Sequence, residues 1–164
     1  MKEIKLSKRG KNRNLNLVAL VDDQDYEWLN KFNWAASKCK NTFYAVKRSK
    51  RGEKPVRMHR LILGLTDPKI LSDHEYRNGL NNQRSNLRIC TRSQNNANRT
   101  PLGSSKYLGV FFSPNSTKRP WYSRIVKDKK PKYLGSFVTE QEAAIVYNKA
   151  AIELHGEFAN LNKF

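Results

Sequence analysis

Acidic side chains are scarce in this sequence. Its 164 residues include 14 Asp and Glu against 32 Lys and Arg, so the formal net charge is +18. A chain this basic favours a polyanionic partner, and nucleic acid is the expected class. The length allows one or two small domains.

Cysteine and long apolar runs are also lacking. Cys39 and Cys90 form no Cys-x-x-Cys pair, which argues against a zinc knuckle or a disulfide framework and favours two reduced structural thiols. No run of 18 apolar residues occurs, and Met1 to Lys11 has no apolar core of signal-peptide length. We therefore expect a soluble, cytoplasmic protein with no membrane contact.

Positive charge is distributed unevenly along the chain. Residues 1–99 carry 22 basic and 9 acidic side chains, and residues 104–138 carry 8 and 1. Residues 139–164 carry only 2 basic side chains against 4 acidic ones. In the carboxy-terminal part, one face is thus expected to meet phosphates and another is not.

The amino-terminal part has the patterns of a small mixed α/β platform. A helix is indicated at 22–32, a Gly-containing turn at 49–53, and an apolar segment at 56–65. Strands are indicated at three further places: 16–21, 34–37 and 42–48.

A hairpin and a helix are predicted next. Strands at 70–75 and 87–90 flank the turn-forming residues of 78–82, and Thr91 and Gln94 have capping-box spacing for a helix. This order of elements brings His74, Asn86 and Asn95 together. An imidazole, an orienting amide and oxygen donors in one place suggest a metal-dependent phosphodiesterase.

The same region resembles the HNH nucleases with a ββα-metal site, and specifically the phage-type HNH homing endonucleases. The resemblance is carried by six short motifs: Met58-His59-Arg60, Asp73-His74, Asn78-Gly79-Leu80-Asn81-Asn82, Ser85-Asn86-Leu87-Arg88, Cys90-Thr91 and Gln94-Asn95-Asn96. It implies His74 as the general base, Asn86 as the residue that orients it, and Asp73 and Asn95 as metal ligands. The third letter of the motif is Asn here, as in some homing members.

Each implied role has a physical reason. A neutral imidazole accepts a proton from water near neutral pH. A carboxylate and an amide carbonyl are hard oxygen ligands, which suit one Mg²⁺ or Mn²⁺ ion. The role of His59 stays undecided: it either contributes to the site or caps the preceding segment. His155 is expected to interact with the carboxy-terminal end of a helix.

The carboxy-terminal part is expected to be a three-stranded sheet packed on one helix. A linker at 98–104, rich in small and polar residues, separates it from the first domain, 1–99. Strands are indicated at 107–112, 121–127 and 131–137. Thr139 and Glu142 have capping-box spacing, and apolar residues recur every 3 or 4 positions up to Gly156. The fold class is therefore α+β, with a second domain at 104–164.

This part resembles the plant ethylene-response-factor (Apetala-type) DNA-binding domain. The matching residues are Tyr107 to Val110, Trp121 to Ile125, Tyr133 to Phe137, Glu142 to Ala144, Tyr147, Ala150-Ala151 and Asn160 to Asn162. The resemblance implies a sheet that lies in the major groove of duplex DNA. Leu108, Phe111 and Ser113 stand where the plant domains usually carry arginines, so sequence readout is expected to differ and to be weaker.

Strand alternation predicts which side chains face DNA. If Trp121, Ser123 and Ile125 face the helix, the opposite face carries Tyr122 and Arg124, with Phe111, Ser113 and Tyr133 from the neighbouring strands. Arg124 is the expected base contact, and phosphates are expected to meet Lys118, Arg119, Lys127, Lys129, Lys130 and Lys132.

The combined interpretation is a homing-type DNA endonuclease. We expect a monomer without an obligate protein partner, which would nick duplex DNA because one chain supplies one site. The main alternative is a DNA-binding regulator with an inactive nuclease module, disfavoured by the presence of Asp73, His74, Asn86 and Asn95. An RNA-binding protein, with Phe111, Tyr122 and Tyr133 stacking on unpaired bases, is the other alternative.

Overall fold

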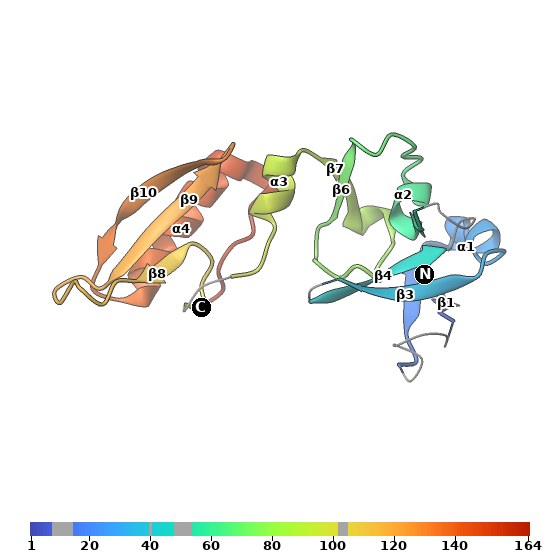
Figure 1. The fold of residues 1–164 in the computed structure, drawn as a ribbon, viewed down its shortest axis with the longest axis horizontal. Helices are drawn as coiled ribbons and strands as arrows, with labels where there is room; N and C mark the ends of the chain where they lie inside the picture. The colour runs from blue at the N-terminus through green and yellow to red at the C-terminus, as the bar shows by residue number, and fades with distance from the viewer. Residues whose placement is uncertain (8–14, 40, 48–53, 102–104) are drawn as a thin grey trace. The chain divides into compact units, whose positions relative to one another are not determined.

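The chain folds into two compact units, Met1–Cys90 and Thr91–Phe164 (Figure 1). The computed structural model describes residues 1–7, 15–39, 41–47, 54–101 and 105–164. The division comes directly after Cys90, earlier than the linker expected at 98–104, so the helix that starts after Thr91 belongs to the second unit. Residues 102–104 of that linker, and the turn expected at 49–53, lie outside the described residues.

Three small antiparallel sheets build the first unit. β1 (Lys2–Lys5) pairs with β2 (Val18–Val21), and β6 (Leu71–His74) pairs with β7 (Leu87–Cys90). The third sheet has the order β3-β4-β5, formed by Trp34–Cys39, Thr42–Lys47 and Val56–Arg57. The strands expected from the sequence are confirmed. The sequence pattern does not predict β1, because this strand shows only isolated aliphatic residues between charges.

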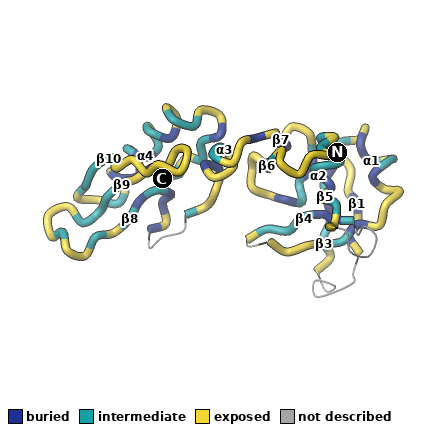
Figure 2. The backbone as a smooth tube through the Cα atoms, turned by 45° about the horizontal axis from the view of Figure 1, so that its top comes forward, coloured by how far each residue is buried: buried dark blue, intermediate teal, exposed yellow. Residues whose placement is uncertain are grey.

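Short helices connect these sheets. α1 (Asp23–Leu29) follows β2, α2 (Met58–Ile62) follows β5, and the 3-10 turn η1 (Arg84–Asn86) precedes β7. Their apolar side chains share one core with the strands (Figure 2), which includes Ile4, Val21, Leu29, Trp34, Met58, Ile62 and Leu87. Burial of these side chains is the main stabilising contribution in a unit of this size.

The loop between β6 and β7 is held against two other sheets. Leu20 of β2 donates its N–H to the carbonyl of Leu80 (2.9 Å) and accepts from the N–H of Asn82 (2.8 Å). On the other side, the N–H of Gly79 donates to Oγ1 of Thr42 in β4 (3.0 Å). These bonds fix the backbone that surrounds the end of β6.

The second unit is a three-stranded antiparallel sheet with a helix on one face, as the sequence predicts (Figure 1). Its strand order is β10-β9-β8, formed by Lys130–Phe137, Trp121–Lys127 and Val110–Phe112. The covering helix is α4 (Glu140–His155), and α3 (Arg92–Ala97) and the 3-10 turn η2 (Gly156–Phe158) complete the unit. Both predicted capping boxes, Thr91 with Gln94 and Thr139 with Glu142, are present.

The face of the sheet that meets α4 is apolar. Ser123 and Ile125 of β9 are buried, and the helix contributes Ala143, Ala144, Tyr147 and Ala151. Gly109 has a φ of +74°, and a Cβ there would lie 2.0 Å from the ring of Tyr147. The close approach of strand and helix therefore requires glycine at this position.

The observed fold class is α+β, as expected. Within the described part of the chain, no helix has the length and apolar character needed to cross a membrane.

Candidate active site and nucleic-acid interface

Asp73 and His74 end strand β6, opposite Arg88 and Leu87 of β7. The Asp73 carboxylate accepts a hydrogen bond from the Arg88 guanidinium (Nη2 to Oδ2, 3.2 Å), and the same guanidinium lies 3.9 Å from Glu75. Asp73 and Arg88 are both largely shielded from solvent. The hairpin thus presents a carboxylate that is held in place from the neighbouring strand.

His74 is packed in a cluster of rings. It is 4% exposed, and its ring centroid lies 4.7 Å from that of His59, in an edge-to-face arrangement, and 5.6 Å from that of Tyr44. Burial lowers the pKa of His74, although a hydrogen bond to Asn82 and the charge of Asp73 act in the opposite direction. The imidazole is therefore neutral at neutral pH, the form that can accept a proton.

Asn82 determines which nitrogen of His74 carries the proton. Its Nδ2 donates to the carbonyl of Leu80 (3.1 Å), which turns its Oδ1 towards Nε2 of His74 at 3.4 Å. An amide oxygen only accepts hydrogen bonds, so Nε2 is the protonated nitrogen in this network. In this tautomer the lone pair of the ring is on Nδ1.

Asn86 is buried at the end of η1, directly before β7, and its amide holds the loop. Its Oδ1 accepts from the N–H of Tyr76 (2.8 Å), and its Nδ2 donates to the carbonyl of Asn81 (2.7 Å). Its backbone carbonyl also accepts from the N–H of Glu75 (2.9 Å). These bonds fix the loop that follows His74, so Asn86 acts on the ring through this loop.

Asn82 is the functional candidate that sequence reasoning missed. The sequence places it only among several turn-forming residues, yet its side chain is fully buried and contacts the imidazole. An Asn-Asn pair in a turn gives no indication of which amide points inward. Only the hydrogen bonds of the loop to β2 decide that Asn82 does.

His59 lies on α2, in contact with the ring of His74, and is 3% exposed. Burial is the main reason that its pKa falls to about 3, with further lowering by the charge on His74 and by Arg57. His59 is therefore neutral over the whole physiological range. Of the two roles that the sequence left open, its placement favours a contribution to the site.

The oxygen donors that the resemblance implies for a metal ion are distributed over both units. Asp73 is on β6, and Asn95 is exposed on α3 of the second unit. In the described ranges, no group of three or more His, Cys, Asp and Glu side chains gathers to hold a metal ion. A carboxylate has about four lone-pair positions, so one carboxylate can accept from an arginine and also bind a cation. A carboxylate and an amide oxygen are ligands that suit Mg²⁺ or Mn²⁺, which keep several waters.

In the second unit, the sheet face opposite α4 carries an aromatic stripe, formed by Phe111, Tyr122 and Tyr133. The rings of Phe111 and Tyr122 are stacked with centroids 5.3 Å apart, and Tyr133 lies 6.4 Å from Tyr122. The Arg124 guanidinium lies 4.9 Å from the centre of the Phe111 ring. The predicted alternation of β9 is confirmed, because Ser123 and Ile125 are buried whereas Arg124 is exposed.

The other side chains expected to face DNA lie around this stripe. Ser113 follows β8 and donates its N–H to the carbonyl of Pro120 (2.7 Å). The expected phosphate contacts are all exposed: Lys118, Arg119, Lys127, Lys129, Lys130 and Lys132. Asp128 and Lys129 both have positive φ, 50° and 66°, as a two-residue hairpin turn of type I′ requires.

Comparison with known proteins supports both resemblances. The chain is 35% identical over 103 residues to an uncharacterized HNH endonuclease of Acanthamoeba polyphaga mimivirus, which covers 63% of this chain and 52% of that protein. It is 43% identical over 72 residues to an ethylene-responsive transcription factor of Arabidopsis thaliana, over 43% of this chain and 36% of that protein. The chain thus spans about half the length of the first relative and about a third of the second. No family model matches the chain.

Proposed function

We propose that this protein is a metal-dependent HNH endonuclease of the homing type, which hydrolyses phosphodiester bonds in duplex DNA. The observation that supports this most strongly is the environment of His74. The imidazole is buried next to Asp73, its Nε2 faces an amide oxygen, and burial lowers its pKa. A base held in one tautomer beside a carboxylate is the arrangement that activation of water requires.

In this proposal, Nδ1 of His74 takes a proton from the water that attacks phosphorus. Asn82 keeps the ring in the required tautomer, and Asn86 holds the loop that follows His74. The two asparagines thus divide the orienting role that the resemblance assigned to Asn86 alone.

Asp73 and Asn95 are the proposed ligands of one Mg²⁺ or Mn²⁺ ion, as the resemblance to the ββα-metal nucleases implies. A bound divalent ion would stabilise the negative charge on the pentacoordinate phosphorus of the transition state and on the leaving 3′ oxygen. Arg88 keeps the Asp73 carboxylate in a fixed orientation through its hydrogen bond.

The second unit is proposed to bind duplex DNA and to position it for cleavage. Arg124 is the proposed base contact, with Phe111, Tyr122, Tyr133 and Ser113 beside it on the same face of the sheet, and the six exposed cations around the stripe meet phosphates. A phage-type homing endonuclease acting as a monomer fits this division of roles.

The alternative proposal is a DNA-binding regulator without nuclease activity. A specific observation favours the nuclease: the ring cluster of Tyr44, His59 and His74 places two histidines in a buried position. A module that serves only as structure would be at least as stable with apolar side chains at these positions, because the burial of polar groups costs free energy.

The decisive experiment compares the wild-type protein with His74→Ala on supercoiled plasmid and phage DNA, with Mg²⁺ or Mn²⁺. We expect the wild-type protein to convert supercoiled plasmid and His74→Ala to leave it intact, while both bind duplex DNA equally well in EDTA. Thermal unfolding of both proteins checks that the fold survives the substitution.

Three outcomes would contradict the proposal in different ways. Cleavage that survives in His74→Ala would exclude His74 as the base. Binding of duplex DNA by the wild-type protein, with no cleavage for either metal, would favour the regulator. Preference for single-stranded RNA over duplex DNA in a competition experiment would favour the RNA-binding alternative.

A further inference from the structure

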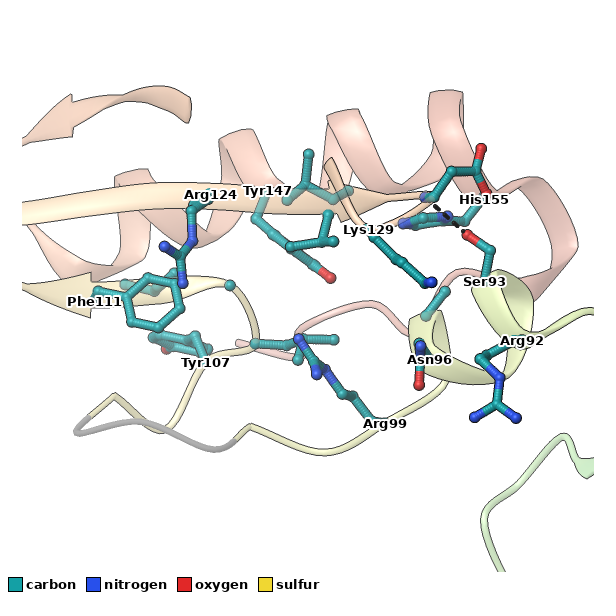
Figure 3. Close-up of a pocket in the computed structure, with 17 residues that line it drawn as sticks. Arg92, Ser93, Asn96, Arg99, Tyr107, Phe111, Arg124, Lys129, Tyr147 and His155 are labelled. Carbon is teal, nitrogen blue, oxygen red and sulfur yellow. Dashed lines mark hydrogen bonds between the residues drawn. The ribbon is translucent and has the colours of Figure 1, made fainter. Parts of the chain in front are cut away.

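The second unit contains a cavity of about 610 Å³ beside the carboxy-terminal half of strand β9 (Figure 3). Its inner wall is apolar, with Leu108, Ile125 and Tyr147 among the lining residues. Its volume is within the range of ligand-binding sites in proteins. The roles proposed so far place no ligand in this space.

Hydrogen bonds within the second unit fix the two sides of the cavity. Ser93 of α3 accepts the N–H of Asp128, at the turn between β9 and β10, at 3.2 Å. After α3, the carbonyl of Arg99 accepts from Nδ2 of Asn160 at 2.8 Å. The segment around α3 is therefore tied to the sheet and to the segment after α4, so the cavity is a formed feature of this unit.

Cations reach the cavity from three different segments. Arg99 follows α3, Arg124 is on β9, and Lys129 is in the hairpin turn. Figure 3 shows Arg99 and Lys129 extending into the pocket from opposite sides, with Arg124 on the wall next to Phe111, and Arg92 at the edge. Asp128 is the single acidic residue among those that line it. Like charges around an apolar wall favour an anion, because their interaction with it is less screened than in open water.

The backbone of β9 adds a donor on the same side. β8 ends its pairing at Val110, opposite Ser123, and the N–H of Arg124 donates to the carbonyl of Gly109 at 2.9 Å. Since strand residues two apart point their N–H groups the same way, the N–H of Val126 points towards the cavity that it lines. Backbone N–H groups are frequent partners of phosphate oxygens.

Arg124 joins this cavity to the aromatic stripe. It lies over the ring of Phe111, and both residues also line the cavity. A DNA strand placed on the stripe would therefore continue past Arg124 towards Lys129 and Arg99. This continuity, together with the charge, identifies the occupant as the sugar-phosphate backbone of the bound nucleic acid.

We propose that the cavity between α3 and β9 binds phosphate groups of the DNA strand that crosses the aromatic stripe, with Arg99 and Arg92 as additional contacts. The inference rests on the proposed function, because it extends the DNA-binding surface. It enlarges that surface beyond the sheet to α3, the helix that also carries Asn95. Such contacts do not read sequence, so they add to affinity for all duplexes alike.

The test measures the affinity of the full chain for two unrelated duplexes in EDTA, as a function of salt. Arg92→Gln/Arg99→Gln is compared with the matched control Lys149→Gln/Lys163→Gln, which removes two exposed cations outside the cavity. We expect the cavity variant to weaken binding to both duplexes by the same factor. The slope of log affinity against log salt should fall in magnitude by about 0.9 for each phosphate that the variant no longer neutralises.

A second variant tests the cavity without a change in charge. Asn96 is exposed and lines the cavity, so Asn96→Trp should fill part of it and weaken DNA binding while the unfolding temperature is retained. Full affinity of Asn96→Trp, or a salt slope of the arginine variant equal to that of the control, would overturn the inference. Failure of the wild-type protein to bind any duplex would instead overturn the proposed function itself.

Discussion

At the residue scale, the candidate site depends on groups whose protonation is fixed by burial. His59 and His74 are both more than nine-tenths shielded and lie ring against ring. In both, burial makes the largest contribution to lowering the pKa. Two adjacent imidazolium ions would repel each other in a poorly solvated space, so the folded state keeps them neutral.

The first prediction concerns the stability of the fold at low pH. The pKa of His59 is about 3 in the folded protein against 6.5 for an unperturbed side chain. In the unfolded chain His59 binds a proton below about pH 6.5, whereas in the folded protein it binds this proton only near pH 3. Stability is therefore complete above pH 6.5 and declines as the pH falls between these values, by about 2 to 3 kcal/mol between pH 6.5 and 4.5.

His59→Phe should remove this contribution. Urea unfolding of the wild-type protein and of the variant at several pH values measures this contribution. As the pH falls, the free energy of unfolding should decrease more for the wild-type protein than for the variant. A constant gap from pH 7 to pH 4.5 would show that His59 titrates normally. His155→Phe is the comparison: burial also lowers the pKa of His155, but this side chain is only partly buried, so its variant should show a smaller change with pH.

The second prediction concerns Asn82. Asn82→Leu keeps the size of the side chain but removes the acceptor for Nε2 of His74, so both tautomers become populated. We expect kcat for DNA cleavage to fall by about tenfold or more, up to the 10² to 10⁴ that general-base catalysis contributes, with KM nearly unchanged. Asn82→Asp retains an oxygen acceptor and should recover part of kcat. Equal activity of Asn82→Leu and wild type would remove Asn82 from the mechanism.

At the element scale, the hairpin of β6 and β7 is held by its loop rather than by its length. The two strands have four residues each, and their loop is anchored to β2 at Leu20 and to β4 at Thr42. A further anchor is the Arg84 guanidinium, which makes two hydrogen bonds of 2.8 Å to buried Asp25 of α1. Short hairpins are not stable alone, so these anchors keep His74 and Asn86 in register.

The third prediction concerns Gly79, at the closest of these contacts. A Cβ at this position would lie 2.4 Å from the backbone carbonyl of Phe43 and 2.7 Å from the Tyr44 ring. Gly79→Ala must therefore move the loop away from β4, at a cost of about 1 to 3 kcal/mol in the free energy of unfolding. Cleavage should fall further than stability alone explains, because Tyr44 also packs on His74.

Gly64→Ala provides the comparison for this prediction. Gly64 has a φ of +65° but no atom within 4 Å of the added Cβ, so the substitution introduces backbone strain without displacing a neighbour. We expect it to lower the unfolding temperature and to leave cleavage intact under conditions where the protein is folded. A Gly79→Ala protein with normal cleavage would show that the loop does not position the site.

At the scale of the whole molecule, the chain divides its chemistry between two compact units. The first contains the buried histidines and Asp73, and the second contains the aromatic stripe with its surrounding cations. In the second unit the acidic side chains lie mainly on α4 and η2, which include Glu140, Glu142, Glu153 and Glu157. The sheet face opposite α4 is therefore the more positively charged one.

The fourth prediction follows from one candidate site per chain. A monomer that cuts one strand per binding event should convert supercoiled plasmid to the open circular form, with linear product appearing only after a delay. A time course on agarose gels at several protein concentrations measures this. Linear product that forms without an open circular precursor, and in proportion to the square of the protein concentration, would indicate a dimer that cuts both strands.

The sequence by itself determined the elements and their chemistry. The alternation of residues indicated β9, the turn-forming residues at 78–82 indicated the hairpin that ends in β7, and the two capping boxes set the starts of α3 and α4. These features depend on residues close in the chain. The charge of +18 and the paired motifs around His74 indicated nucleic acid and a nuclease. Local patterns did not reveal β1, whose stability depends on its pairing with β2.

Only the tertiary structure decided how the side chains meet. The contact of Asn82 with the imidazole, the packing of His59 on His74 and the place of α3 in the second unit all depend on contacts between distant segments. The physical reason is that burial and hydrogen-bond geometry are properties of the packed chain. The sequence specifies which reactive groups are present, whereas packing determines which of them lie close enough to interact.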